Sequence, residues 1–391
     1  MIALSKPLSY ASYLECSRCK KEFSLSSVNT YATCCNQPLM VKYEYMHGYF
    51  REDLVFREKS MWRYFEMLPV LERRNVVSLG EGMTPLLPLE NLAASHGFAD
   101  LMMKDESGNP TGSFKARGLS MAVSKAKELG VTHCIIPTAG NAGGALAAYA
   151  AKAGIGCTVV MPRHTPAIFK QECELYGAEL ILVDGLINDC AKKVAELRSQ
   201  YDYFDMSTLK EPYRLEGKKT MGYEIAEQLN WQLPDVIVYP AGGGTGLIGI
   251  WKAFREMLMM GWIKGPLPRM IAVQAANCAP VLKAFHDPEH WREDFVPMPS
   301  LANGLAVPYP FGMDMMQQVL QDSGGTVIAI SDQDIMEGVR EIARTEGLLV
   351  APEGAALWKA LLELRKTNQV HPAEKIVLLN TGSGYKYLEN L

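Results

Sequence analysis

A lysine stands where the chain changes from a loop to a helix. Residues 109–112 read N-P-T-G, a composition typical of turns. Ser113 is a favoured helix N-cap, so the sequence predicts a helix from Phe114 to about residue 130. Lys115 then falls in the first turn, where the partial positive charge of the helix N-terminus favours a neutral amine. Because a neutral amine can attack a carbonyl carbon, Lys115 is a candidate Schiff-base nucleophile rather than an ordinary surface charge.

Three further segments carry groups that can hold a ligand. Residues 138–144 read T-A-G-N-A-G-G and residues 241–246 read A-G-G-G-T-G, each between a predicted strand and a predicted helix. Backbone N–H groups at such helix starts attract carboxylates or phosphates. The second loop lacks the lysine of a nucleotide-binding P-loop, so it favours a simpler phosphate. Thr381 follows the last predicted strand, at the edge where α/β sheets bind ligands. An ordinary tight turn is the alternative at all three.

Four cysteines near the N-terminus are spaced for a metal. Cys16 and Cys19 form C-x-x-C, and Cys34 and Cys35 follow as an adjacent pair. Four thiolates can close a tetrahedral zinc site, and the polar connectors with residues 39–45 fit a small β hairpin. Ala32 stands where a second C-x-x-C would have its first cysteine. Two interpretations stay open: a structural zinc site, or a ribbon-like β module that no longer binds metal.

Alternating apolar strands and amphipathic helices must position these residues. Such alternation predicts parallel sheets with right-handed crossovers, and the cleft between two α/β units is a natural ligand site. The fold class expected is α/β, with two three-layer domains behind a zinc-ribbon-like module. The domains expected are a module at 1–45, a larger α/β domain at 46–118 and 216–391, and a smaller one at 119–215. The strands expected are residues 134–137, 157–161, 179–183, 203–206, 236–239, 270–274, 327–330 and 376–379. The helices expected after the first are residues 142–153, 166–176, 188–201, 247–259, 332–346 and 355–367.

Composition excludes several classes of protein. The 391 residues are 48% hydrophobic and 21% charged, which is ordinary for a globular protein. A net charge of −4 offers no basic field for nucleic acid and no polybasic patch for a membrane. No apolar run approaches the roughly 20 residues of a membrane span. The first ten residues lack the pattern of a secretory signal, so a cytoplasmic enzyme is expected.

The motifs together resemble a known family. Residues 109–118, 138–143, 242–246 and 381–384 occur in the order and context of fold-type II pyridoxal-phosphate (PLP) enzymes, the tryptophan synthase β-like superfamily. The chain most resembles the threonine synthases. Residues 79–86, L-G-E-G-M-T-P-L, are similar to that family's L-G-E-G-x-T-P-L motif, and N-P-T-G-S-F-K is shared as well. The resemblance covers the chain from about residue 76 to the C-terminus.

The resemblance implies a role for each motif. Lys115 would form the Schiff base with the cofactor and then carry protons, with Phe114 packed beside the ring. Thr381 would face the pyridine nitrogen, and Asn141 the cofactor's 3′-oxygen. A neutral hydroxyl stabilises a pyridinium less than a carboxylate would, which suits elimination and replacement at the β or γ carbon. The residues implied for the cofactor phosphate are Gly242, Gly243, Gly244, Thr245 and Gly246. Those implied for the substrate carboxylate are Thr138, Ala139, Gly140 and Asn141.

The activity implied is that of a lyase making L-threonine and phosphate from O-phospho-L-homoserine and water, in a homodimer. Ala116 stands where the family usually has aspartate, and many dehydratases lack that aspartate too. A threonine or serine dehydratase giving a 2-oxo acid and ammonia therefore remains an alternative. So do a cysteate-synthase-like β-replacement on phosphoserine and a PLP-binding regulator without activity. The L-G-E-G motif and the cysteine-bearing head favour the synthase. No residue is assigned to the substrate phosphate.

Overall fold

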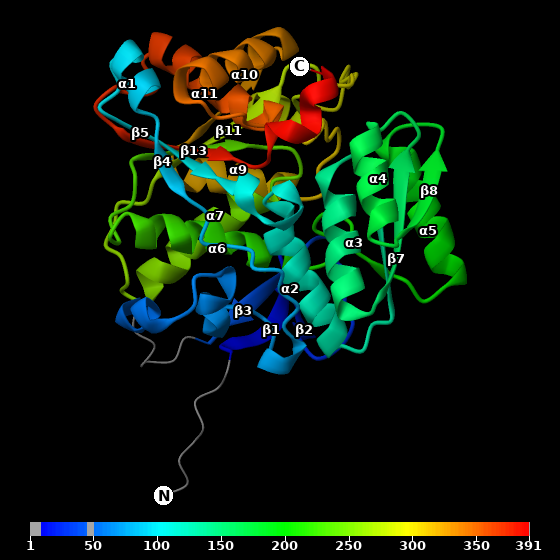
Figure 1. Ribbon diagram of the computed structural model, residues 1–391. Coiled ribbons are helices and arrows are strands. Elements are labelled where there is room, and N and C mark those ends of the chain that lie inside the picture. Colours follow the sequence, from blue (N-terminus) through cyan, green and yellow to red (C-terminus); the bar gives the residue numbers. More distant parts are fainter. Residues whose placement is uncertain (1–8, 45–50, 391) are drawn as a thin grey trace, which may run out of the picture. The chain divides into compact units, whose positions relative to one another are not determined.

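The computed structural model describes residues 9–44 and 51–390 (Figure 1). The chain divides into two compact units. The first comprises Met1–Met83 and Lys115–Thr220, and the second Thr84–Phe114 and Met221–Leu391. Each contains a mainly parallel sheet with helices on both faces, so the α/β class predicted from alternation is confirmed. None of the helices in the described ranges is long and apolar enough to cross a bilayer.

The first unit begins with a three-stranded antiparallel module, in the order β2-β1-β3. Its strands are β1 (Ala11–Cys16), β2 (Glu22–Ser24) and β3 (Leu39–Tyr43). Leu14, Leu39 and Val41 are buried on one face of this sheet, because alternate residues of a strand point to the same face. The small β unit expected near residues 39–45 is therefore present as far as it is described; residue 45 lies outside the described residues.

A four-stranded parallel sheet, in the order β8-β7-β6-β9, forms the rest of the first unit. Helices α3 and α4 cover one face and α5 the other (Figure 1). Ile135, Val160, Cys190 and Val194 pack together between this sheet and α5. The strands are β6 (His133–Pro137), β7 (Gly156–Pro162), β8 (Glu179–Val183) and β9 (Phe204–Asp205). The helices are α2 (Lys115–Glu128), α3 (Asn141–Ala153), α4 (Ala167–Leu175), α5 (Ile187–Gln200) and α6 (Tyr213–Gln228), the last of which continues into the second unit.

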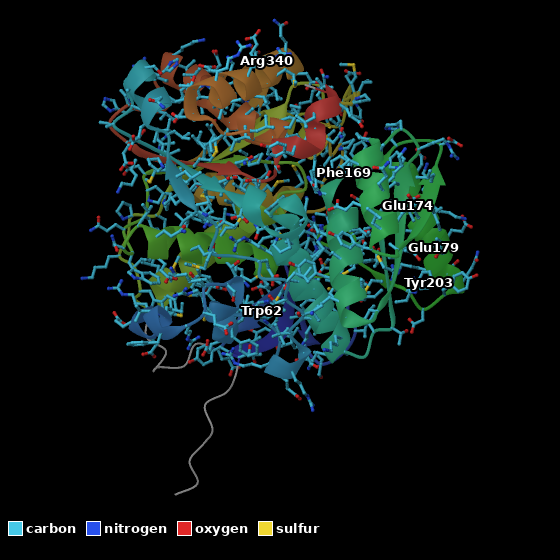
Figure 2. The ribbon with its side chains drawn as sticks, viewed as in Figure 1. Trp62, Phe169, Glu174, Glu179, Tyr203 and Arg340 are labelled. Atoms are coloured by element: carbon cyan, nitrogen blue, oxygen red, sulfur yellow. The ribbon has the colours of Figure 1, made fainter. Side chains whose placement is uncertain are left out.

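Residues 51–83 also group with the first unit, whereas the boundaries expected from sequence put them, with residues 115–118, in the larger domain. They form short 3₁₀ helices and a loop that ends in the L-G-E-G motif. Buried Glu81 fixes this segment: Trp62, labelled in Figure 2, donates its indole N–H to the Glu81 carboxylate at 2.8 Å. The hydroxyl of Ser120 on α2 donates to the same oxygen at 2.5 Å. The 3₁₀ helices are η1 (Arg51–Phe56), η2 (Met61–Met67) and η3 (Arg73–Asn75).

The second unit contains a six-stranded sheet in the order β12-β11-β10-β13-β5-β4, parallel except for β4. Helix α11 packs on one face, and α7 and α9 on the other (Figure 1). The strands are β4 (Leu86–Pro88), β5 (Asp100–Asp105), β10 (Val236–Pro240), β11 (Arg269–Ala275), β12 (Thr326–Ile330) and β13 (Lys375–Asn380). The helices are α1 (Glu90–His96), α7 (Thr245–Met259), α8 (Pro280–His286), α9 (Met313–Asp322), α10 (Asp332–Glu346) and α11 (Pro352–Lys366), with the 3₁₀ turns η4 (Glu106–Gly108), η5 (Pro110–Gly112) and η6 (Gly384–Asn390).

Strand β5 was not predicted, although it lies inside this sheet between β13 and β4, and its sequence shows why. Its residue Lys104 is fully buried, which no apolar pattern indicates. The Lys104 ammonium donates to the Glu224 carboxylate on α6 at 2.8 Å and to the main-chain oxygen of Thr84 at 2.7 Å. A buried charge is tolerated only with such partners. A strand that ends in charged residues, one of them a buried and paired lysine, resembles a polar loop in the sequence.

Candidate active site

Lys115 is the first residue of α2, one residue after the helix start that the sequence predicts, and Ser113 does not cap the helix through its side chain. The Ser113 hydroxyl is buried and has no hydrogen-bond partner among the described residues. The main chain holds the turn instead: Phe114 N–H donates to the Thr381 carbonyl at 3.0 Å, and Ser113 forms an antiparallel bridge with Gly382. The residue before the lysine is thus anchored to the loop after β13.

Phe114 has the polar side chains of Tyr239 and Glu106 near it in the second unit. Its ring meets the Tyr239 ring edge to face, with centroids 6.5 Å apart. Burial, and then the charge of Glu106, raise the pKa of Tyr239, so this phenol stays neutral. Glu106 in turn accepts hydrogen bonds from Thr84 Oγ1 at 2.6 Å and Asn109 Nδ2 at 2.8 Å. These contacts fix the loop that leads into Lys115.

The glycine-rich loop follows β10 and opens the 15-residue helix α7 at Thr245. Gly244 has φ +76°, where side chains are strained, and a Cβ there would lie 2.2 Å from the Met316 sulfur. A Cβ on Gly246 would lie 2.0 Å from the Tyr239 hydroxyl oxygen, and one on Gly242 would lie 2.1 Å from a carbonyl oxygen. Only glycine fits at these positions. The positive end of a long helix behind a side-chain-free loop suits a phosphate.

The turn before Lys115, which the loop after β13 contacts, contains buried hydroxyls without hydrogen-bond partners among the described residues. Thr381 is buried directly after β13. Facing the same turn, Ser383 N–H donates to the Gly112 carbonyl at 2.9 Å. Besides the Ser113 hydroxyl, the Thr111 hydroxyl is buried with no hydrogen-bond partner among the described residues. Such groups in a native fold are satisfied by an ordered water or a ligand. The second unit therefore fits a polar, phosphate-bearing group.

The asparagine loop belongs to the first unit. Asn141 is the first residue of α3, after the loop that follows β6. Within that loop Gly140 N–H donates to the Thr138 hydroxyl at 3.2 Å. A Cβ on Gly144 would lie 2.1 Å from a carboxylate oxygen of Glu172, so the first turn of α3 is closely packed. The strand, loop and helix start needed for an anion site are in place.

The sequence did not predict a cluster of buried charged residues near Lys115. Lys218 on α6 is fully buried, and its Cε lies 3.2 Å from where a Cβ on Gly118 would be, one turn along α2 from Lys115. Burial, and then repulsion by Lys115 and Arg214, lower the pKa of Lys218 well below its ordinary value. Burial also raises the pKa of Glu211 to about 8, against the attraction of Arg214. Helix α6 carries charged residues at buried positions, so its sequence lacks the amphipathic pattern that would predict a helix.

Comparison with known proteins agrees with this geometry. Residues 77–382 match the family of pyridoxal-phosphate dependent enzymes. The chain is 34% identical to a threonine synthase of Methanocaldococcus jannaschii, over 95% of this chain and 92% of that protein. It is also 34% identical to one of Methanosarcina acetivorans, over 95% and 91%.

The chain belongs to the family of pyridoxal-phosphate-dependent enzymes. Two solved structures share its fold. Maize serine racemase covers 78% of this chain and 93% of its own length with a TM-score of 0.67 at 23% identity. Threonine deaminase isoform 2 of Solanum lycopersicum covers 88% and 93% with a TM-score of 0.65 at 19% identity. The fold-type II architecture and the PLP cofactor expected from the motifs are thereby confirmed. The roles of the individual site residues stay predictions.

Proposed function

We propose that this PLP enzyme is a threonine synthase that converts O-phospho-L-homoserine and water to L-threonine and phosphate. The observation that carries the proposal is the match of 34% identity over 95% of the chain to proteins named threonine synthase. Placement of Lys115 at the first turn of α2 supports it. The proposal includes a homodimer, which light scattering of the purified protein would test.

The bound cofactor supplies an electron sink for the charge that develops at the substrate's α carbon. Lys115 acts as the general base that takes the α proton and then a β proton. Phosphate leaves the γ carbon, a proton is returned to that carbon, and hydroxide from water adds at the β carbon. Lys115 finally returns a proton to the α carbon, so that atoms balance between substrate and threonine.

Other residues of this chain hold and orient the reactants. The amides of Gly242, Gly243, Gly244 and Gly246 with Thr245 hold the cofactor phosphate, because a helix N-terminus stabilises an anion there. Thr381 would offer its hydroxyl to the ring nitrogen, and Phe114 would pack beside the ring. Thr138, Ala139, Gly140 and Asn141 would hold the substrate carboxylate, and Asn141 would also donate to the cofactor's 3′-oxygen.

A panel of substrates separates this proposal from its alternatives. We would offer O-phosphohomoserine, threonine, serine and phosphoserine in parallel and measure phosphate, 2-oxo acids and amino acids. Phosphate together with an equal amount of threonine is the expected result. A 2-oxo acid from threonine or serine, with no turnover of O-phosphohomoserine, would overturn the proposal. Phosphate release from phosphoserine only when sulfite is present would indicate the β-replacement reaction.

Replacement of the lysine tests the mechanism. We expect Lys115→Ala to lose activity by at least 1,000-fold, on the order of the loss when a covalent catalytic group is removed. Lys127→Ala, at an exposed lysine near the end of the same helix, is the matched control and should retain activity. Borohydride reduction followed by peptide mapping should place the cofactor on Lys115 in the wild type. Finding the adduct on another lysine would remove Lys115 from this role.

A further inference from the structure

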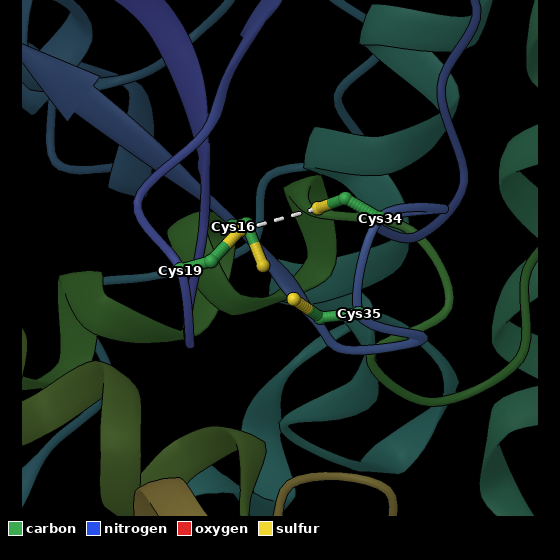
Figure 3. A group of neighbouring side chains, drawn as sticks. All are labelled: Cys16, Cys19, Cys34 and Cys35. Carbon is green, nitrogen blue, oxygen red and sulfur yellow. Dashed lines mark hydrogen bonds between the residues drawn. The ribbon is translucent and has the colours of Figure 1, made fainter.

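The N-terminal module brings four cysteine sulfurs to one point (Figure 3). Cys16 ends β1, Cys19 lies in the turn that follows, and Cys34 and Cys35 lie in the loop between β2 and β3. The four Sγ atoms all lie within 4.8 Å of one another, and those of Cys19 and Cys34 are 3.4 Å apart. Two segments that are separated by β2 thus bring their thiols together, beside a backbone hydrogen bond from Ser17 N–H to the Pro38 carbonyl at 3.0 Å.

The two cysteine-bearing turns have the same backbone design. In the first, Cys16 N–H donates to the Lys21 carbonyl at 2.9 Å, and Lys20 has φ +66°. In the second, Ala32 N–H donates to the Gln37 carbonyl at 2.8 Å, and Asn36 has φ +49°. Each turn closes over the same number of residues, with a left-handed residue directly after its last cysteine.

This equivalence explains the irregular spacing in the second turn. Ala32 occupies the position that Cys16 occupies in the first turn, and Cys35 corresponds to Cys19. The fourth sulfur comes instead from Cys34, inside the turn, whose Sγ still reaches Cys19. The Cys34 sulfur therefore supplies the fourth thiol of the cluster, although position 32, where the C-x-x-C pattern would have a cysteine, is alanine.

The sulfur separations suit a metal better than a disulfide. Zn–S bonds of about 2.3 Å at tetrahedral angles place sulfurs about 3.8 Å apart, within the range found here. A disulfide requires about 2.05 Å and joins only two of the four. All nine cysteines of the chain are free thiols in this structure. A closed set of four thiolates leaves no open position, which is the arrangement of a structural site.

We infer that Cys16, Cys19, Cys34 and Cys35 bind one structural zinc ion, an assignment independent of the proposed activity. The ion ties β1 to the loop before β3, and β3 ends in Tyr43. The Tyr43 hydroxyl donates to the buried Glu216 carboxylate on α6 at 2.6 Å. The ammonium of Lys219 lies 2.6 Å from that carboxylate and 3.8 Å from the Tyr43 ring centroid. A metal that orders the module therefore also holds Tyr43 on α6, because metal binding energy is folding energy in so small a unit.

Elemental analysis of the full-length protein is the first test. We would purify it with reductant and without added chelator, and expect about one zinc per chain, the content of a single four-thiolate site. Refolding with cobalt should give the thiolate charge-transfer and tetrahedral d–d absorption bands. Absence of zinc, iron and cobalt binding would overturn the inference, as would a Cys19–Cys34 disulfide in protein that retains its thermal stability without metal. Iron in place of zinc would overturn the choice of metal.

Two variants test the unusual ligand. Cys34→Ala should lose at least tenfold in zinc affinity, and Cys278→Ala, at a buried thiol far along the chain, should keep the full content. Ala32→Cys combined with Cys34→Ala rebuilds C-x-x-C and should restore binding. Full zinc affinity in Cys34→Ala alone would show that this sulfur is not a ligand. The zinc content of the wild-type protein decides the inference even where a variant fails to fold.

Discussion

Glu81 is the residue through which the L-G-E-G motif acts in the first unit. Its buried carboxylate accepts hydrogen bonds from Trp62 and Ser120, and from the Tyr149 hydroxyl at 2.6 Å. Ser120 lies on α2 and Tyr149 on α3, the helices that begin at Lys115 and Asn141. Burial, and then the charge of Glu81, raise the pKa of Tyr149, so the phenol remains a donor. The sequence marked the motif, but only the structure shows that its glutamate joins these two helices.

We expect Glu81→Gln to lower the midpoint of thermal unfolding by about 4 °C or more. The glutamine amide has one oxygen and an NH2 group in place of the other, so it can no longer accept all of these hydrogen bonds. A hydrogen bond to a buried charge contributes roughly 1.5–3 kcal/mol, which corresponds to several degrees in the unfolding midpoint of a protein of this size. Differential scanning calorimetry measures the change. Glu90→Gln, at an exposed carboxylate, is the control and should shift the midpoint by no more than about 1 °C. Equal midpoints for both variants would contradict the role of Glu81.

At the scale of elements, the loop between β10 and α7 matters because its glycines leave no side chain beside the helix start. The reason differs at each position: Gly244 needs its left-handed backbone, whereas Gly246 is limited by the Tyr239 hydroxyl. Tyr239 is itself held near Glu106 and Phe114. The glycine loop before α7 and the loop leading to Lys115 therefore share one support.

Gly246→Ala should weaken PLP binding at least tenfold, because the new methyl displaces Tyr239 or the first turn of α7. Titration of the apoprotein with PLP, followed by visible absorption, measures the affinity. Gly108→Ala serves as the control: open space surrounds that position, so its affinity should match the wild type. Unchanged affinity in Gly246→Ala would mean that this turn does not hold the cofactor.

At the scale of the whole molecule, a ligand that binds only the folded chain must stabilise it. We expect removal of PLP to lower the thermal midpoint, since a ligand at 100 times its dissociation constant adds about 2.7 kcal/mol. Midpoints of apoprotein and PLP-loaded protein, recorded over a range of PLP concentrations, test this. On addition of PLP, the thermal midpoint of Lys115→Ala should rise less than that of the wild type, because the covalent link is lost. Equal midpoints with and without PLP would contradict binding to the native fold.

Features set by neighbouring residues could be predicted from the sequence. The strands and helices around the glycine loops lie within a few residues of their expected bounds, and Lys115 begins its helix, because turn residues and hydrophobic periodicity act locally. The order of the motifs likewise sufficed to indicate a PLP enzyme.

Only the tertiary structure decided which polar groups are buried and with which partners. Lys104 in β5, Glu81 in its loop and Lys218 on α6 each read as surface charges, yet all are buried. The partners of Lys104 and Glu81 come from distant segments, so no periodic pattern can reveal them. The same holds for Cys34, whose sulfur reaches Cys19 across a hairpin although its spacing is irregular. Local chemistry determines the elements and their order, whereas pairing across the fold determines where charge and thiolate can be held.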